Sequence, residues 1–253
     1  MKFFLMTLLF ISTNVFAYTL ANPLRIGFNS GDVKVYIGSD NCVNANLSPT
    51  ALESLVKDAI NDYWNTVATS SLKIESLGVS SISSNGDTGL STAAAKTAVN
   101  SIIVGCNNDL PEFSTPGVLG VGGNSCSGTN CRGVVIMNDA VGTYMATEDR
   151  ATIVNALAHE MGHALGLGHT SVQEALMYFN LTINGKVQKS LHQDDIDGIT
   201  YLYPNKKSLS GLGGACGTIS LDDKERKNYW MSFLFGIACL VFFKARLRAL
   251  RYL

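Results

Sequence analysis

The stretch His159-Glu160-Met161-Gly162-His163-Ala164-Leu165-Gly166-Leu167-Gly168-His169 decides the fold and holds three of the four histidines in the chain. On a helix, His159 and His163 project from one face, because residues four apart are neighbours there. Gly166 can end that helix in the left-handed conformation, so the chain can turn back and bring His169 to the same point. Three imidazoles with a fourth position open to water form the donor set of a catalytic zinc.

Glu160 directly follows the first of these histidines. A carboxylate there can take a proton from metal-activated water without itself binding the metal. The alternative is that the histidines merely fill a helix core or an exposed face. The fixed offsets of the glycine and the third histidine, with only His192 elsewhere, favour the metal site over that alternative.

Residues 1–17 are typical of a secretory signal, with Lys2 as the charged start, an apolar run over Phe3–Ile11 and small residues before Ala17. An uncleaved anchor is the alternative, but the run is short for a membrane span. Residues 18–31 follow as a short lead-in without regular period. The net charge of −1 provides no basic field for nucleic acid.

Export changes how the six cysteines are interpreted, because disulfides form in oxidising compartments. Two pairs are predicted and two thiols are left over: Cys126 with Cys131, Cys42 with Cys106, and the remaining Cys216 and Cys239.

Apolar periodicity between residues 32 and 204 predicts a single domain of strands and helices. Strands are expected at 33–37, 72–74, 101–106, 118–123 and 133–138, and helices at 49–67, 150–165 and 191–203. The strand at 118–123 has the small residues of a sheet edge, where a substrate backbone can approach closely. Residues 78–98 are expected to form a loop that can include a weak helical turn.

Three motifs together resemble the matrixin branch of the metzincin zinc peptidases: residues 159–169, residues 175–178 (Ala-Leu-Met-Tyr), and residues 193–203 (Gln-Asp-Asp-Ile-Asp-Gly-Ile-Thr-Tyr-Leu-Tyr). The resemblance covers roughly residues 24–204. It implies an α+β, zincin-like domain with a twisted, mixed five-stranded sheet, three helices and an extended cleft over one zinc ion.

The resemblance also implies endopeptidase activity on proteins, with Glu160 as general base and acid. Met177 would be the Met-turn residue, and Asp194 or Asp195 would support that turn through hydrogen bonds. Tyr178 would begin the wall of the pocket that takes the residue after the cut.

The sequence departs from the matrixin pattern in several ways. No prodomain with a zinc-blocking cysteine is visible; Cys42 could play that role, although a disulfide is favoured. A second, structural zinc is not expected because only His192 remains. Structural calcium near Asp139 lacks a convincing acidic cluster. Phe179-Asn180 replaces the usual proline after the Met-Tyr pair.

The C-terminal region is expected to be a linker (205–228), an apolar transmembrane segment (229–243) and a basic cytoplasmic tail (244–253). The alternatives are an apolar helix packed on the domain, or a sorting signal processed by a membrane protease at or near Cys216. The segment has 15 residues, fewer than the ~20 of a typical span.

The sequence therefore predicts an exported zinc metalloendopeptidase at the cell envelope or surface, tethered by its C-terminal helix or released after processing. Its partners would be protein or peptide substrates. A surface-anchored binding or adhesion module with a vestigial zinc site is the alternative from another class. A peptidase that matures one specific partner is a narrower variant of the first hypothesis.

Overall fold

The computed structural model describes residues 18–205 except 25, 26, 116, 129, 181, 184 and 185. A five-stranded sheet runs through this part of the chain, in the order β2-β1-β3-β5-β4. Its strands are β1 (Asp32–Ile37), β2 (Lys73–Val79), β3 (Ser101–Asn107), β4 (Gly120–Ser127) and β5 (Asn130–Asn138). All neighbours pair in parallel except β4, which runs antiparallel to β5 and forms one edge. The sheet is therefore mixed, as expected.

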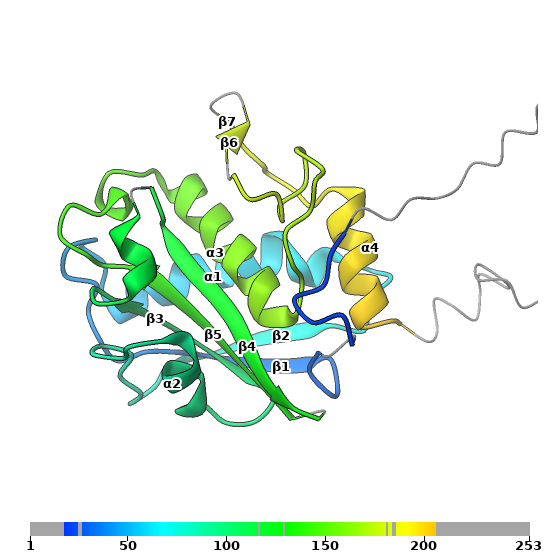
Figure 1. The fold of residues 1–253 in the computed structure, drawn as a ribbon, viewed down its shortest axis with the longest axis horizontal. Coiled ribbons are helices and arrows are strands. Elements are labelled where there is room, and N and C mark those ends of the chain that lie inside the picture. The colour runs from blue at the N-terminus through cyan, green and yellow to red at the C-terminus, as the bar shows by residue number, and fades with distance from the viewer. Residues whose placement is uncertain are drawn as a thin grey trace, which may run out of the picture. The chain divides into compact units, whose positions relative to one another are not determined.

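Two long helices, α1 (Pro49–Asp62) and α3 (Arg150–Leu165), cover one face of the sheet, and the short α2 (Leu90–Ala95) lies on the other (Figure 1). The helix α4 (Gln193–Leu202) closes the domain beyond the end of α3. Shorter elements connect these parts: the 3-10 turns at Trp64–Thr66, Pro111–Ser114 and Tyr144–Ala146, and the small hairpin of β6 (Thr182–Ile183) and β7 (Lys186–Val187).

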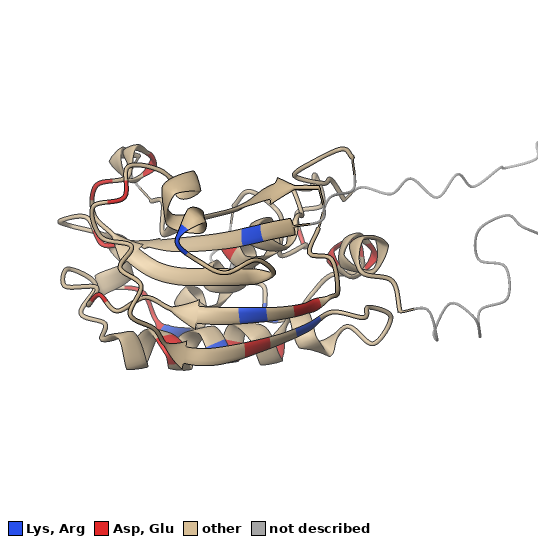
Figure 2. Ribbon diagram, turned by 90° about the horizontal axis from the view of Figure 1, so that it is seen from below, with Lys and Arg blue, Asp and Glu red and all other residues tan. Residues whose placement is uncertain are grey.

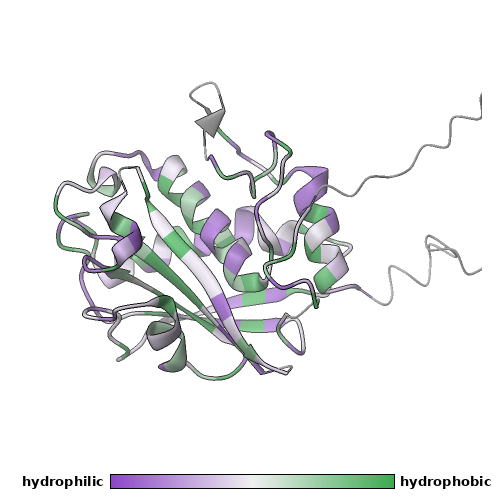
Figure 3. Ribbon diagram, in the orientation of Figure 1, coloured by the Kyte–Doolittle hydropathy of each residue, from purple (hydrophilic) through white to green (hydrophobic). Residues whose placement is uncertain are grey.

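Successive side chains of a strand point to opposite faces of the sheet, and this alternation produces two hydrophobic cores. Ile102 and Val104 of β3 join the larger core under α1 and α3, whereas Ile103 between them joins a smaller core with α2. The strands carry hydrophobic residues along their length (Figure 3). Each fully buried Leu or Ile contributes about 1.5–3 kcal/mol, so the larger core dominates the stability of the domain.

Charges are interspersed on the sheet, with basic and acidic residues side by side on neighbouring strands (Figure 2). Lys34 of β1 pairs with Glu75 directly opposite on β2. Two disulfides join the pairs named above: Cys42–Cys106, and Cys126–Cys131 across the β4–β5 hairpin.

Several element boundaries differ from those expected. The segment 78–98 begins with the last two residues of β2 and contains the helix α2, which is longer than the weak helical turn considered there; the rest of the segment is loop, as expected. The Ala93 and Ala94 side chains are buried against the sheet. This tertiary contact stabilises a short helix whose polar and apolar faces are weakly marked in the sequence. The helix α1 ends at Asp62, five residues early, because Tyr63 leaves helical geometry at φ −118°, ψ −81°.

No helix within the described residues is long and apolar enough to cross a membrane. The predicted signal segment 1–17 and transmembrane segment 229–243 lie outside the described residues.

Candidate metal centre and substrate cleft

The helix α3 carries two of the predicted ligands and has a defined start and end. Asp149 caps its first turn, accepting a hydrogen bond from the Thr152 N–H at 2.7 Å. At the other end, Gly166 has φ 112°, and its N–H donates to the carbonyls of Gly162 and His163. A side chain is strained at this φ, so glycine permits the turn that returns the chain to the metal ligands.

The three predicted ligands meet at one point. The Nε2 atoms of His159, His163 and His169 lie 3.2–3.3 Å from one another. Nitrogens about 2.0–2.1 Å from a tetrahedral zinc lie about 3.3–3.4 Å apart, so the triangle has the size that one zinc ion requires. Within the described chain, these histidines are the one group of three or more potential ligands that could hold a metal ion.

Backbone carbonyls set the ring orientation of two ligands. His159 Nδ1 donates to the Leu176 carbonyl at 2.7 Å, and His163 Nδ1 donates to the Leu167 carbonyl at 2.9 Å. Because a carbonyl only accepts, each Nδ1 carries the proton and each Nε2 presents a lone pair. Converging lone pairs repel one another unless a cation lies between them, which fits a metal site.

Burial keeps the imidazoles neutral. Desolvation, followed by the charge of His163, lowers the pKa of His159 from 6.5 to about 3. Desolvation also lowers the pKa of His163 and of the more exposed His169. Neutral imidazole is the form that binds metal, so burial favours the ligand form of all three histidines.

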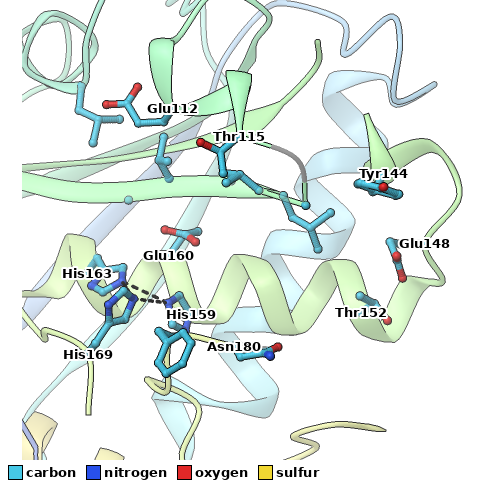
Figure 4. Close-up of a pocket in the computed structure, with 18 residues that line it drawn as sticks. Glu112, Thr115, Tyr144, Glu148, Thr152, His159, Glu160, His163, His169 and Asn180 are labelled. Carbon is cyan, nitrogen blue, oxygen red and sulfur yellow. Dashed lines mark hydrogen bonds between the residues drawn. The ribbon is translucent and has the colours of Figure 1, made fainter. Parts of the chain in front are cut away.

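Glu160 enters the same cleft from α3, close to the three histidines (Figure 4). Desolvation raises the pKa of Glu160 from 4.5 to about 8, opposed by a hydrogen bond from the Gly122 backbone. A cation held by the histidines would lower this pKa again, because it favours the charged carboxylate. Glu160 lies in the same cleft as the three potential metal ligands.

Gly122 allows α3 to pack this closely on β4. A Cβ at residue 122 would lie 2.1 Å from the Glu160 carbonyl oxygen, whereas a Cβ at Gly123 would meet only Leu90, at 3.5 Å. From the sequence, the small residues of this edge strand were expected to let a substrate backbone approach. The structure shows that the missing side chain of Gly122 makes room for the backbone of α3.

Met177 lies beneath α3, with 2% of its surface exposed. A Cβ at Gly162, between the two helical ligands, would lie 2.3 Å from the Met177 sulfur and 2.9 Å from the Trp64 ring. Met177 thus packs on the underside of the ligand helix as an apolar floor. Trp64 ties the same region by donating from its indole N–H to the Ala158 carbonyl at 2.9 Å.

Of the two aspartates expected to support the methionine turn, Asp195 makes the contacts. Its carboxylate accepts from the N–H groups of Leu176, Met177 and His192 at 2.8, 3.0 and 2.9 Å. Asp194 is buried, but one of its carboxylate oxygens has no hydrogen-bond partner within the described chain. His192, the fourth histidine, caps α4 by accepting from the Asp194 N–H at 3.1 Å.

The lead-in segment contributes to the site, which its sequence did not signal. Leu20 pairs with Leu167 in an antiparallel bridge, and the Thr19 carbonyl accepts from the Gly168 N–H at 2.9 Å. The Thr19 hydroxyl donates to the His169 carbonyl. These contacts fix the loop that carries the third ligand. They could not be predicted, because a single backbone pairing leaves no periodic pattern of residues in the sequence.

A cleft of about 940 Å³ surrounds the metal site and runs along β4. Phe179 and Asn180 line it, whereas Tyr178 does not. Tyr178 instead supports Phe179, with ring centroids 4.4 Å apart. The role of Tyr178 in the wall of the pocket after the methionine stays a prediction.

Asp139, considered for calcium, is engaged elsewhere. Its two carboxylate oxygens accept from the N–H groups of Val43 and Ala45 at 2.9 and 2.8 Å. Asp139 therefore fixes the loop that carries Cys42.

Comparison with known proteins agrees with this geometry. The family model described as Matrixin, a peptidase family, matches residues 41–204, which is more than half of the chain. The chain belongs to the matrixin family.

Curated relatives match over shorter segments. The chain is 34% identical to metalloendoproteinase 2-MMP of Arabidopsis thaliana over 76 residues, which are 30% of this chain and 20% of that protein. It is 45% identical to human neutrophil collagenase over 65 residues, which are 26% of this chain and 14% of that protein. Bovine interstitial collagenase is 56% identical over 57 residues, 22% of this chain and 12% of that protein. These matches span a quarter or less of each relative.

Proposed function

We propose that the protein is a zinc-dependent metalloendopeptidase that hydrolyses peptide bonds in proteins. The observation that carries this proposal is the triangle of His159, His163 and His169 Nε2 atoms, sized for one tetrahedral ion, with Glu160 beside it in one cleft. Membership of the matrixin family and the collagenases among the relatives support it.

Each residue has a defined part in the proposed hydrolysis. Zinc, when bound, supplies Lewis-acid chemistry that activates water and polarises a carbonyl. The histidines hold the ion with neutral Nε2 atoms. Glu160 takes a proton from the attacking water and returns it to the departing amine. The free edge of β4 offers backbone groups that can pair with an extended substrate.

Replacement of the general base tests the proposal. Glu160→Ala is expected to keep one zinc ion per chain and the native fold, yet to cleave casein several orders of magnitude more slowly. Glu174→Ala, an exposed glutamate outside the cleft, is the matched control and should keep full activity. Equal cleavage by Glu160→Ala and the parent would refute the mechanism. Zinc binding without cleavage by the parent would instead favour the surface-binding alternative.

We also propose that the protein is exported and held at the membrane by residues 229–243, either permanently or until a sorting protease acts. The pattern of residues 1–17 supports export. The two disulfides support it as well, because such bonds persist in oxidising compartments. Cell fractionation, with the intact mass of the mature protein, tests this: a cytosolic protein with an intact N-terminus and free thiols contradicts it.

A further inference from the structure

The cleft carries unbalanced negative charge. Apart from Glu160 and the three histidines, its charged lining residues are Glu112 and Glu148, and no lysine or arginine lines it within the described chain. Figure 4 places the two glutamates apart: Glu148 lies beyond Thr152 at the start of α3, whereas Glu112 lies across β4, toward the end that holds His163. Both glutamates line the same cleft as the three histidines.

Neither glutamate is committed to the fold. Both are exposed, and neither forms an ion pair with another described residue. The neighbouring Asp149, in contrast, is used to cap α3. Free carboxylates in the wall of a cleft are available to a ligand.

Apolar residues also line the cleft. They are Leu90 of α2, Val121 of β4, and Val118 and Leu119 just before β4. On the segment that follows Met177, Phe179 leaves 66% of its surface exposed, although a phenyl ring gains by burial. A substrate that covers this surface would bury apolar side chains near the metal and bring its flanking residues toward the carboxylates.

We propose that Glu112 and Glu148 select substrates in which an apolar segment at the cleavage site has lysine or arginine on either side. This inference rests on the proposed peptidase function and adds the substrate class. Acidic flanks would be disfavoured at both ends, since each would meet a carboxylate of like charge.

The effect of each charge is expected to be modest and to depend on salt. An exposed charge pair changes an affinity by about two- to fivefold. Raising the salt from about 0.1 M to 1 M shortens the screening distance from about 10 Å to about 3 Å, so the preference should largely disappear.

Three peptides with one apolar centre test the proposal on the zinc-loaded full chain: one with lysine on both flanks, one with lysine on a single flank and one with glutamine on both. The parent should cleave the doubly basic peptide with a kcat/KM about four- to twenty-five-fold above that of the glutamine peptide at low salt. Glu112→Gln and Glu148→Gln should each remove the preference at one flank, measured as the ratio of kcat/KM for the lysine peptides to kcat/KM for the glutamine peptide. Glu174→Gln is the matched control and should keep the parental preference.

Binding of the same peptides to zinc-loaded Glu160→Ala, measured by calorimetry, separates this inference from the proposed function. Preferential binding of the lysine peptides without cleavage by the parent would contradict the peptidase and leave the selectivity standing. Cleavage of lysine and glutamine peptides at equal rates, or a preference that survives in the double variant Glu112→Gln/Glu148→Gln, would overturn the selectivity and leave the peptidase standing.

Discussion

The carboxylate of Asp195 accepts the backbone N–H of Met177 at 3.0 Å, which links α4 to the residue beneath the metal ligands. The other carboxylate oxygen accepts from Leu176, whose carbonyl in turn orients His159. A chain of two hydrogen bonds thus runs from α4 to a metal ligand. Ligand orientation therefore depends on a residue that touches neither metal nor substrate.

Asp195→Asn should disturb the orientation of His159 through these two hydrogen bonds. An amide replaces one acceptor oxygen by a donor, which leaves a backbone N–H unpaired in a buried place. We expect the zinc-free protein to lose about 1–3 kcal/mol in free energy of unfolding, and zinc affinity to fall about 10–100-fold. Urea unfolding and zinc titration measure the two effects.

Asp194→Asn is the matched control, because one Asp194 oxygen has no partner within the described chain. Its loss of stability should stay below about 1 kcal/mol. Equal losses in the two variants would mean that Asp195 has no special role in the methionine turn.

Gly122→Ala should push α3 away from β4. The new Cβ would lie 2.1 Å from the Glu160 carbonyl oxygen, and backbone there cannot yield as a flexible side chain would. We expect kcat/KM for casein to fall at least tenfold, and stability to fall by about 1–3 kcal/mol.

Gly123→Ala changes the next residue of the same strand, where the nearest atom to the new Cβ is Leu90 Cδ1 at 3.5 Å. Its activity should stay within about twofold of the parent. Similar activities for the two variants would show that the close approach of α3 to β4 is not needed.

The stability of the metal-free protein should pass through a maximum near pH 6.5. Burial lowers the pKa of His159 to about 3 and also lowers the pKa values of His163 and His169, so the folded protein binds fewer protons than the unfolded chain below 6.5. Their contribution is present above pH 6.5 and is lost as the pH falls. Burial raises the pKa of Glu160 to about 8, so its contribution is present below 4.5 and is lost as the pH rises toward 8.

Urea midpoints between pH 4 and 9 on chelator-treated protein measure this profile. Glu160→Gln removes the titrating carboxyl and should flatten the fall above pH 6.5 while keeping the loss in acid. A metal-free Glu160→Gln variant, in which the opposing carboxyl is removed, that is as stable at pH 4.5 as at pH 6.5 would contradict the burial of the histidines.

The sequence predicted those parts of the molecule that follow from local pattern. The helix at 150–165 was predicted with its observed bounds, and Gly166 marks its end in the sequence. The meeting of His159, His163 and His169 followed from spacing, and so did the Cys126–Cys131 pair. The Cys42–Cys106 pair was a hypothesis without a spacing argument, and the structure confirms it.

Other parts depend on contacts between distant segments, which one sequence does not reveal. Neither Asp194 nor Asp195 could be preferred until the structure showed which carboxylate reaches Leu176 and Met177. The contact of Thr19 with the loop of His169 joins segments 150 residues apart. The helix α2 forms in a stretch of small polar residues because Ala93 and Ala94 pack on the sheet, a tertiary effect that outweighs weak local preference.

The central claim is that three imidazoles hold one zinc ion and leave one position open to water. X-ray absorption at the zinc edge, on protein loaded with one equivalent of zinc, tests it most directly. We predict three imidazole nitrogens and one oxygen at about 2.0–2.1 Å in the parent, and two imidazoles with weaker binding in His169→Ala. A sulfur ligand at about 2.3 Å in the parent, or an unchanged three-imidazole spectrum in His169→Ala, would contradict the claim.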